Sequence, residues 1–377
     1  MGFFDRISKN SITEIEMELV SGIPLVDVVI GEKTYKFMFD TGAFSIIPKS
    51  IMERLSLEPL KEDIEIVDAS GVGDTLKLYT LPLLEIGGMQ FCDFRVGVAD
   101  FAQQFPVSCL GFDGIFGYNF LENLVIKLEY DKRKITLSDK KLQHKDYQTL
   151  TMKYIPYYPP MIHFDFGFTD LWIGIDTGKN DGILIGDTQI QKRFKEHGLS
   201  SKKTFGFFSS SFSGINHHRQ RESFLATDFS LDKKIEIQQY PIDFDDSAQY
   251  LIGNHFLKNF NVIIDFKRRK VHLKKLFNGV LCQGFEADFG FSFFYNESQA
   301  LFISAIEENS PAAKAGLKLD DKVLEINGVD TLHFSAEDFC KLIVEKQYKN
   351  ASSLELVLHR DHHKILKKTV VRPLHSC

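Results

Sequence analysis

Two copies of the tripeptide Asp-Thr-Gly are the residues of this chain best suited to chemistry. They begin at Asp40 and Asp176, and the sequence holds no third copy. Two carboxyl groups held a few ångströms apart cannot both ionise, so they share one proton. One carboxylate can then act as a base on a water molecule while the protonated one polarises a peptide carbonyl. The pair therefore predicts general acid–base chemistry, provided that the fold brings both loops together.

An internal repeat surrounds the two tripeptides, which lie 136 residues apart. The same offset places Gly117 on Gly253, each 77 residues after its aspartate, and the Phe, Leu, Asn and Arg residues that follow match without a gap. Apolar runs typical of strands precede the tripeptides at residues 35–39 and 171–175. Repeated chemistry at a constant offset predicts two similar lobes.

Both lobes are predicted to be β structures, with lobe 1 at residues 10–145 and lobe 2 at residues 146–278. Apolar and polar residues alternate at 76–84 and 125–137, and turn residues occur at short intervals. This pattern favours small β-barrels or sandwiches over a βαβ sheet.

Helix signals occur after each tripeptide and again near the C-terminus. In lobe 1, Pro48 is expected near a helix start, where its missing N–H does no harm. In lobe 2, Asp187 is the expected N-cap and Gly198 the expected stop. Ser310 and Ser335 are expected to cap two further helices.

A two-lobed β protein with one Asp-Thr-Gly in each lobe resembles the pepsin-like and retropepsin-like aspartic protease families. The hydrophobic-hydrophobic-Gly element that supports each catalytic loop in these families is matched at residues 114–117 and 251–253. The resemblance implies a mainly β, bilobal fold of two barrel lobes. It also implies an aspartic endopeptidase in which Asp40 and Asp176 activate water between them.

The resemblance also implies supporting roles for the neighbours of the two aspartates. Thr41 and Thr177 would cross-bond the two loops and hold the carboxylates coplanar. Gly42 and Gly178 would allow a tight turn and a close approach of the backbone. Ala43, together with two flap-like hairpins, is more similar to the retropepsins than to the pepsins.

The hairpins that would close over substrate are the second part of this resemblance. Ser70, Gly71, Val72 and Gly73 match the first flap, and a loop rich in Gly and Ser near Gly206 matches a second one. These four residues are the expected flap and substrate-binding positions.

Lys179 departs from the family pattern, which has Ser, Thr or Ala at this position. An ammonium group there could pair with Asp176 and hold it ionised. The alternative function is therefore a catalytically inactive pseudoprotease that acts as a peptide-binding or scaffold protein. A further alternative is that each Asp-Thr-Gly only forms a turn.

A third domain is predicted at residues 284–374, where the pattern changes. A capped helix with a glycine stop at 310–317 is followed by a strand and turn at 320–328. With the strands expected at 354–359 and 364–370, this order resembles a small α+β PDZ domain in the permuted form attached to bacterial proteases.

The PDZ resemblance implies capture of an extended peptide between the second strand and the helix that begins near Ser335. The carboxylate-binding loop of that family is matched by Gly290, Phe291, Ser292 and Phe293, with Ser in place of a glycine. The expected partners are thus peptide or protein substrates and a C-terminal peptide ligand. The alternative is a domain that packs on the two lobes with its groove blocked by its own chain.

Composition and charge exclude several other classes of protein. The net charge of −6 does not indicate nucleic-acid binding. The basic clusters at 132–134 and 267–270 lie in expected turns, where they are solvated. Neither a metal nor a cofactor is expected, and the five scattered cysteines indicate neither a zinc site nor a disulfide framework. Because both half-sites lie in one chain, a monomer is expected.

Targeting signals are weak in this sequence. No apolar stretch is long enough to span a membrane, and the first ten residues lack the apolar core of a signal peptide. The expected location is cytoplasmic for the chain as written, or exported, for example periplasmic, if the true start lies upstream.

Overall fold

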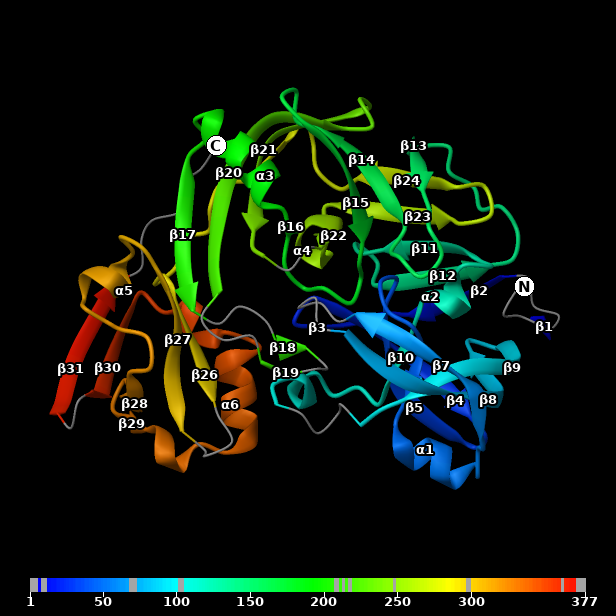
Figure 1. Cartoon of the computed structure of the whole chain (residues 1–377), viewed down its shortest axis with the longest axis horizontal. Coiled ribbons are helices and arrows are strands. Elements are labelled where there is room, and N and C mark those ends of the chain that lie inside the picture. The colour runs from blue at the N-terminus through cyan, green and yellow to red at the C-terminus, as the bar shows by residue number, and fades with distance from the viewer. Residues whose placement is uncertain are drawn as a thin grey trace.

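The chain folds into two β lobes and a smaller C-terminal module, which lies beside lobe 2 and below it in Figure 1. Among the described residues, no helix has the length and apolar character needed to cross a bilayer. The computed structural model describes all of the chain except residues 1–5, 8–11, 68–72, 101–104, 207–209, 212–213, 216–218, 247–248, 296–299, 361–362 and 371–377.

Lobe 1 is a β-barrel. Six of its strands form a closed ring in the order β4-β5-β10-β6-β9-β8, because β8 pairs with both β9 and β4. The pairings β5–β10 and β6–β9 are parallel and the other four are antiparallel. The elements of lobe 1 outside the central sheet are β1 (Arg6–Ile7), β3 (Glu18–Val20), β4 (Ile23–Ile30), β5 (Lys33–Phe39), β6 (Ile46–Ile47), α1 (Lys49–Arg54), β7 (Pro59–Val67), β8 (Gly73–Ile86), β9 (Met89–Val98), the 3₁₀ turn η1 (Val107–Leu110), β10 (Gly114–Phe116) and α2 (Tyr118–Leu121).

Lobe 2 repeats this ring strand for strand, in the order β14-β15-β22-β16-β21-β20. Its two parallel pairings, β15–β22 and β16–β21, fall at the same places as those of lobe 1. The internal repeat of the sequence is therefore a repeat of topology. The elements of lobe 2 outside the central sheet are β14 (Met161–Asp165), β15 (Asp170–Ile175), β16 (Ile183–Ile185), α3 (Thr188–Glu196), β17 (Ser201–Gly206), β18 (Ser210–Ser211), β19 (Gly214–Ile215), β20 (Arg219–Leu231), β21 (Ile235–Phe244), β22 (Tyr250–Ile252), α4 (Asn254–Leu257) and β25 (Leu281–Cys282).

The central sheet is a six-stranded antiparallel sheet that joins the two lobes, in the order β2-β12-β11-β23-β24-β13. Each lobe contributes three strands, and β11 pairs with β23 at the centre. This sheet fixes the lobes relative to each other, so the loops that end β5 and β15 face each other. Its strands are β2 (Ile12–Glu16), β11 (Val125–Glu129), β12 (Lys134–Ser138), β13 (Gln148–Lys153), β23 (Phe260–Asp265) and β24 (Lys270–Lys275).

The C-terminal module has its own hydrophobic core, built around Phe291, Phe293, Phe339 and Leu356. It also continues the sheet of lobe 2, because β27 pairs antiparallel with β17. The predicted mainly β fold with a small α+β module is confirmed. The elements of the module are β26 (Phe291–Tyr295), β27 (Leu301–Glu307), α5 (Pro311–Lys314), β28 (Lys322–Ile326), β29 (Val329–Asp330), η2 (Thr331–His333), α6 (Ala336–Ile343), η3 (Gln347–Asn350), β30 (Ser353–Arg360) and β31 (His363–Val370).

The expectation of no disulfide framework is wrong for Cys282, which is disulfide-bonded, and for Cys109 and Cys340. Cys109 of η1 and Cys340 of α6 form a disulfide, with their Cα atoms 5.2 Å apart. The bond connects residues 231 positions apart and ties lobe 1 to the C-terminal module. Spacing alone could not reveal it, because only the tertiary fold brings the two cysteines together.

The predicted helix caps are confirmed. The Asp187 carboxylate accepts the N–H groups of Gln189 and Ile190, and Gly198 ends the helix with a φ of 69°. The other two caps are the side chains of Ser310 and Ser335, each of which accepts a backbone N–H of its helix. Ser, Asp and Asn at this position satisfy donors that a helix start leaves unpaired.

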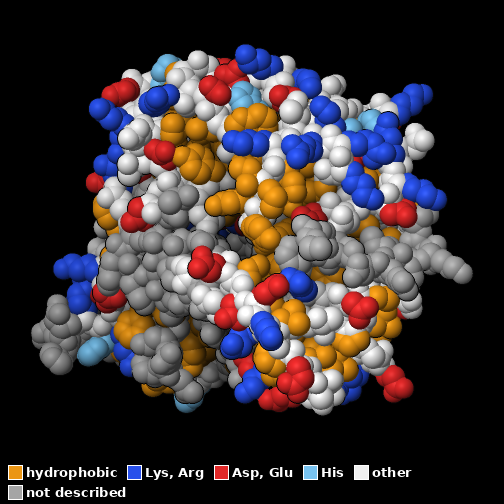
Figure 2. All heavy atoms as spheres, turned by 45° about the vertical axis from the view of Figure 1, so that its right-hand side comes forward, with side chains coloured by type: hydrophobic (Ala, Val, Ile, Leu, Met, Phe, Trp, Pro, Cys, Tyr) orange, Lys and Arg blue, Asp and Glu red, His pale blue; other side chains and the backbone are white. Residues whose placement is uncertain are grey.

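Hydrophobic side chains also reach the surface, in patches among charged ones on the face shown in Figure 2. Tyr157 and Tyr158, in the turn between β13 and β14, are 53% and 59% exposed. The ring of Tyr157 lies 6.2 Å from that of Tyr118, whose N–H donates to the Ala43 carbonyl oxygen at 2.8 Å. The exposed Tyr157 ring thus lies near the buried Tyr118, whose backbone contacts the residue after the first Asp-Thr-Gly.

Candidate active site

Asp40 and Asp176 follow directly on equivalent strands of the two barrels. Asp40 comes after β5 and donates its N–H to Phe116 at 3.0 Å, while Asp176 comes after β15 and donates to Ile252 at 3.0 Å. Both acceptors lie on the hydrophobic-hydrophobic-Gly elements, which pair in parallel with the strands that lead to the aspartates. Each element therefore supports the loop that carries its aspartate.

The two threonines join the loops to each other. The Thr41 hydroxyl accepts the Thr177 N–H at 3.1 Å and donates to the Ile175 carbonyl at 2.7 Å. The Thr177 hydroxyl does the same in return, accepting from Thr41 at 3.0 Å and donating to Phe39 at 2.7 Å. Both threonines are fully buried. Four hydrogen bonds inside the protein thus hold the two loops at a fixed separation.

The glycines of the tripeptides lie against the opposing carboxyl groups. A Cβ placed on Gly42 would lie 2.8 Å from Cγ of Asp176, and one placed on Gly178 would lie 2.5 Å from Cγ of Asp40. A hydrogen bond also links the two carboxyl side chains. The structure therefore brings together the two aspartates that the sequence predicted to pair. The two glycines allow their close approach because they have no side chain.

The two carboxyl groups have different surroundings. Asp40 accepts the N–H groups of Gly42 at 2.7 Å and Ala43 at 3.1 Å, whereas Asp176 accepts the Gly178 N–H at 2.9 Å. Burial raises the pKa of Asp40, and these N–H groups oppose the rise because they stabilise its charged form. Burial and the neighbouring Asp40 raise the pKa of Asp176 well above its usual range. Asp40 thus has more backbone donors that stabilise its charged form than Asp176 has.

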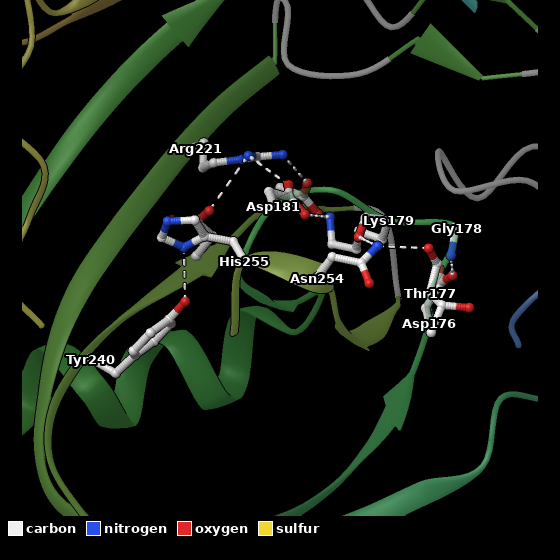
Figure 3. Close-up of polar contacts among 11 residues, drawn as sticks. Asp176, Thr177, Gly178, Lys179, Asp181, Arg221, Tyr240, Asn254 and His255 are labelled. Atoms are coloured by element: carbon white, nitrogen blue, oxygen red, sulfur yellow. Dashed lines mark hydrogen bonds and ion pairs between the residues drawn. The ribbon is translucent and has the colours of Figure 1, made fainter. Parts of the chain in front are cut away.

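Lys179 does not pair with Asp176. Its ammonium group forms an ion pair with Asp181 (Figure 3), and Arg221 lies 3.6 Å from the other oxygen of that carboxylate. The charge of Lys179 still lowers the pKa of Asp176, but burial and Asp40 outweigh it. The expectation that this lysine could hold Asp176 ionised through a salt bridge is therefore corrected.

Several supporting residues were missed by sequence analysis. In lobe 1, the Ser45 hydroxyl accepts the Gly117 N–H, and the Asn119 side chain accepts the Ser45 N–H, both at 2.8 Å. In lobe 2, the Asn254 side chain donates to Thr177 at 2.6 Å and to Lys179 at 2.9 Å, as Figure 3 shows. The sequence signal for the two asparagines is a polar residue just after each hydrophobic-Gly element, whereas Ser45 has no such signal.

Most of the residues expected to form the first flap lie outside the part of the chain that the structure describes. Ser70, Gly71 and Val72 are not among the described residues, whereas Gly73 begins β8 and pairs with Val67. A second hairpin is formed by β17 and β20, which pair from Ser201–Phe224 to Gly206–Arg219. Since β17 also pairs with β27, this hairpin is connected to the C-terminal module, which the sequence did not predict.

The expected carboxylate loop of the C-terminal module lies mostly in a strand. Phe291, Ser292 and Phe293 belong to β26 and pair with β27, and both phenylalanines are buried in the core. Gly290 precedes the strand with a φ of 73° and donates its N–H to the carboxylate of Asp288 at 2.8 Å. That N–H is therefore engaged within the module.

Comparisons with known proteins agree with both parts of this arrangement. Residues 26–120 match the sequence family described as aspartyl protease, and residues 302–350 match the family described as PDZ domain. The chain is thus similar to these two families over the matched residues. Among solved structures, an aspartic proteinase from Irpex lacteus is 13% identical, with 70% of this chain and 97% of that chain covered and a TM-score of 0.46. The family matches support a protease-type function.

Replacement of Thr177 by Val should destabilise the junction of the two lobes. The buried Thr41 N–H and Phe39 carbonyl would lose their partner, so we expect the free energy of unfolding to fall by about 2–4 kcal/mol. Thr177→Ser keeps the hydroxyl and should cost about 1 kcal/mol, the loss of one methyl group. Urea unfolding of both variants measures this, and equal losses would show that the hydroxyl contributes nothing.

Proposed function

We propose that this chain is an aspartic endopeptidase whose active site is formed by Asp40 and Asp176. The observation that carries this proposal is the mutual approach of two buried carboxyl loops, cross-bonded by Thr41 and Thr177 and joined by a hydrogen bond between the aspartates. Such a pair shares one proton and can activate water without any other cofactor.

The unequal surroundings of the carboxyl groups suggest their roles. Asp40 accepts more backbone N–H groups, so it begins as the carboxylate and takes a proton from the attacking water. Asp176 begins protonated and gives its proton to the oxygen of the peptide carbonyl. As the tetrahedral intermediate collapses, Asp40 passes the water proton to the leaving nitrogen. The C–N bond then breaks, and a hydroxyl proton of the intermediate returns to Asp176.

The inactive alternative loses its main support in this structure. It rested on Lys179 holding Asp176 ionised, and Lys179 pairs with Asp181 instead. A direct test is to incubate the chain with an unfolded protein at mildly acidic pH and to identify new termini by mass spectrometry. New internal termini support the endopeptidase, whereas an intact substrate over pH 3 to 7 would favour a peptide-binding role.

The alkaline limb of the pH–rate profile should depend on Lys179. Its positive charge lowers the pKa of Asp176, so its removal in Lys179→Met should raise that pKa further. Because the reaction needs the proton on Asp176, the alkaline limb of kcat/KM should move to higher pH. Lys192→Met is the control, since Lys192 is 76% exposed and pairs with Glu196 on α3. An unmoved limb, or one moved to lower pH, would contradict this role.

The place of action is also part of the proposal. Disulfides persist in oxidising compartments and are rare in the cytosol. The Cys109–Cys340 bond therefore favours the exported alternative over the cytoplasmic one. Thiol labelling of this chain in freshly quenched cell fractions would test the location. A bonded Cys109 in an exported fraction would support export, whereas a free Cys109 would support a cytoplasmic location.

A further inference from the structure

The loop that leads from β9 to β10 in lobe 1 reaches the C-terminal module. Its 3₁₀ turn carries Cys109, which is bonded to Cys340 on α6. Four residues earlier, the ring of Phe105 lies 5.3 Å from that of Tyr295 and 6.5 Å from that of Phe294, both on β26. Residues 105–110 therefore contact both β26 and α6.

These two elements are the ones between which a PDZ domain adds its peptide. Here they already contact each other, since the rings of Tyr295 and Phe339 lie 3.8 Å apart. Phe105 packs against this hydrophobic core although it belongs to lobe 1. A segment of the chain itself thus lies at the expected ligand position.

The start of β26 is poorly suited to binding the C-terminal carboxylate of a peptide. The Gly290 N–H already donates to Asp288, and the Asp288 carboxylate would repel a second carboxylate. Lys349 lies 2.8 Å from Asp288, so its charge is already paired. The contacts that the module makes with residues 105–110 are apolar and covalent instead.

We propose that residues 105–110 are the resident ligand of the β26–α6 surface, and that the Cys109–Cys340 bond is a latch that a dithiol opens. One thiolate of the dithiol attacks a sulfur of the bond and forms a mixed disulfide, and the second thiolate resolves it. The protein gains two thiols and the dithiol becomes a disulfide. The consequence, access for an outside peptide, rests on the peptide binding that the PDZ match suggests.

Opening the latch leaves the module docked on lobe 2. The strand pair β17–β27, the Lys202–Glu307 ion pair at 3.0 Å and the Glu308 N–H bond to Lys203 at 2.7 Å do not involve the disulfide. On the other side, β10 begins at Gly114, five residues after Cys109, and lies beneath the Asp40 loop. Release of residues 105–110 can therefore alter β10, the strand that supports the Asp40 loop.

Amide hydrogen exchange of the full chain tests the latch without any need for hydrolysis. With dithiothreitol, exchange in β26 and α6 should become about tenfold faster, because these elements lose a packed segment. The control segment is β30, in the same module but away from the contact, and it should not change. The variant C109S/C340S should show the fast exchange with or without reductant.

Two results would overturn the latch. One is unchanged exchange in β26 and α6 after reduction of the wild-type chain. The other is an equal acceleration in β30, because the module would then be unfolding as a whole. Faster exchange in β26 and α6 of C109S/C340S on addition of dithiothreitol would also count against it, since the effect would come from the disulfide of Cys282.

A second measurement tests the ligand assignment. The probe is a fluorescent peptide with the sequence of residues 104–111 and Ser at the position of Cys109, made with a free or an amidated C-terminus. Fluorescence anisotropy should show binding of both forms to the variant F105A/C109S, and none to the oxidised wild-type chain. Equal binding to both proteins, binding to neither, or binding of the free-acid form alone would overturn the assignment.

Discussion

Replacement of Asp40 or Asp176 by Asn should each reduce peptide hydrolysis by about 10³-fold or more, because the reaction needs two carboxyl groups that share one proton. Asn has the same size as Asp, so neither change creates a cavity, and the circular dichroism spectrum should stay native. The exposed Asp170 supplies the control, since Asp170→Asn should leave kcat/KM unchanged. The initial rate of cleavage of a fluorogenic peptide measures the effect.

A single variant that keeps near-full activity would contradict the paired mechanism. If Asp40→Asn were active and Asp176→Asn inactive, one carboxylate would suffice and the second would be structural. If both variants were inactive and also lost the native circular dichroism spectrum, the aspartates would be needed for folding. Urea unfolding of the variants would distinguish this case from a loss of catalysis in a folded protein.

Replacement of Gly178 by Ala should also reduce peptide hydrolysis strongly, for a steric reason. The added Cβ would lie 2.5 Å from Cγ of Asp40, closer than non-bonded atoms approach, so the carboxyl groups must separate. A displacement of about 1 Å at reacting groups costs about 10²-fold in rate. We therefore expect kcat/KM to fall by at least that factor, with a smaller change in stability.

Gly182→Ala is the matched control for this steric prediction, because Gly182 lies four residues further along the same chain segment. Its added Cβ would meet the end of the Tyr240 ring, with the nearest atom at 3.2 Å, and that ring can shift. Equal rates for the Gly178 and Gly182 variants would show that the approach of Gly178 to Asp40 has no role in catalysis.

Much of the fold could be predicted because it depends on local signals. The constant offset between Asp40 and Asp176 predicted two lobes, and each lobe is a ring of six strands with the same pairing order. Asp187 and Ser335 cap their helices because a helix start leaves backbone N–H groups that a nearby side-chain oxygen can accept. The limits of the three domains, the roles of the site residues and the flap assignment stay predictions.

Long-range partners could not be predicted in the same way. The apolar residues of β11 and β23 indicate buried strands, but they do not say that the two strands pair across the lobes. Likewise, nothing near Cys109 points to Cys340, because the fold alone brings them together. Lys179 has two carboxylates within a few residues, and sequence spacing does not decide that it pairs with Asp181 rather than Asp176.

Titration of the active site with a transition-state analogue tests the central claim most directly. A peptide that carries a hydroxyethylene group in place of the scissile amide cannot be cleaved, and its hydroxyl can lie between Asp40 and Asp176 where the attacking water would be. Since each chain supplies both half-sites, cleavage of an unfolded protein should fall linearly to zero at one inhibitor per chain. Cleavage that persists at saturation, or an end point of one inhibitor per two chains, would contradict the account.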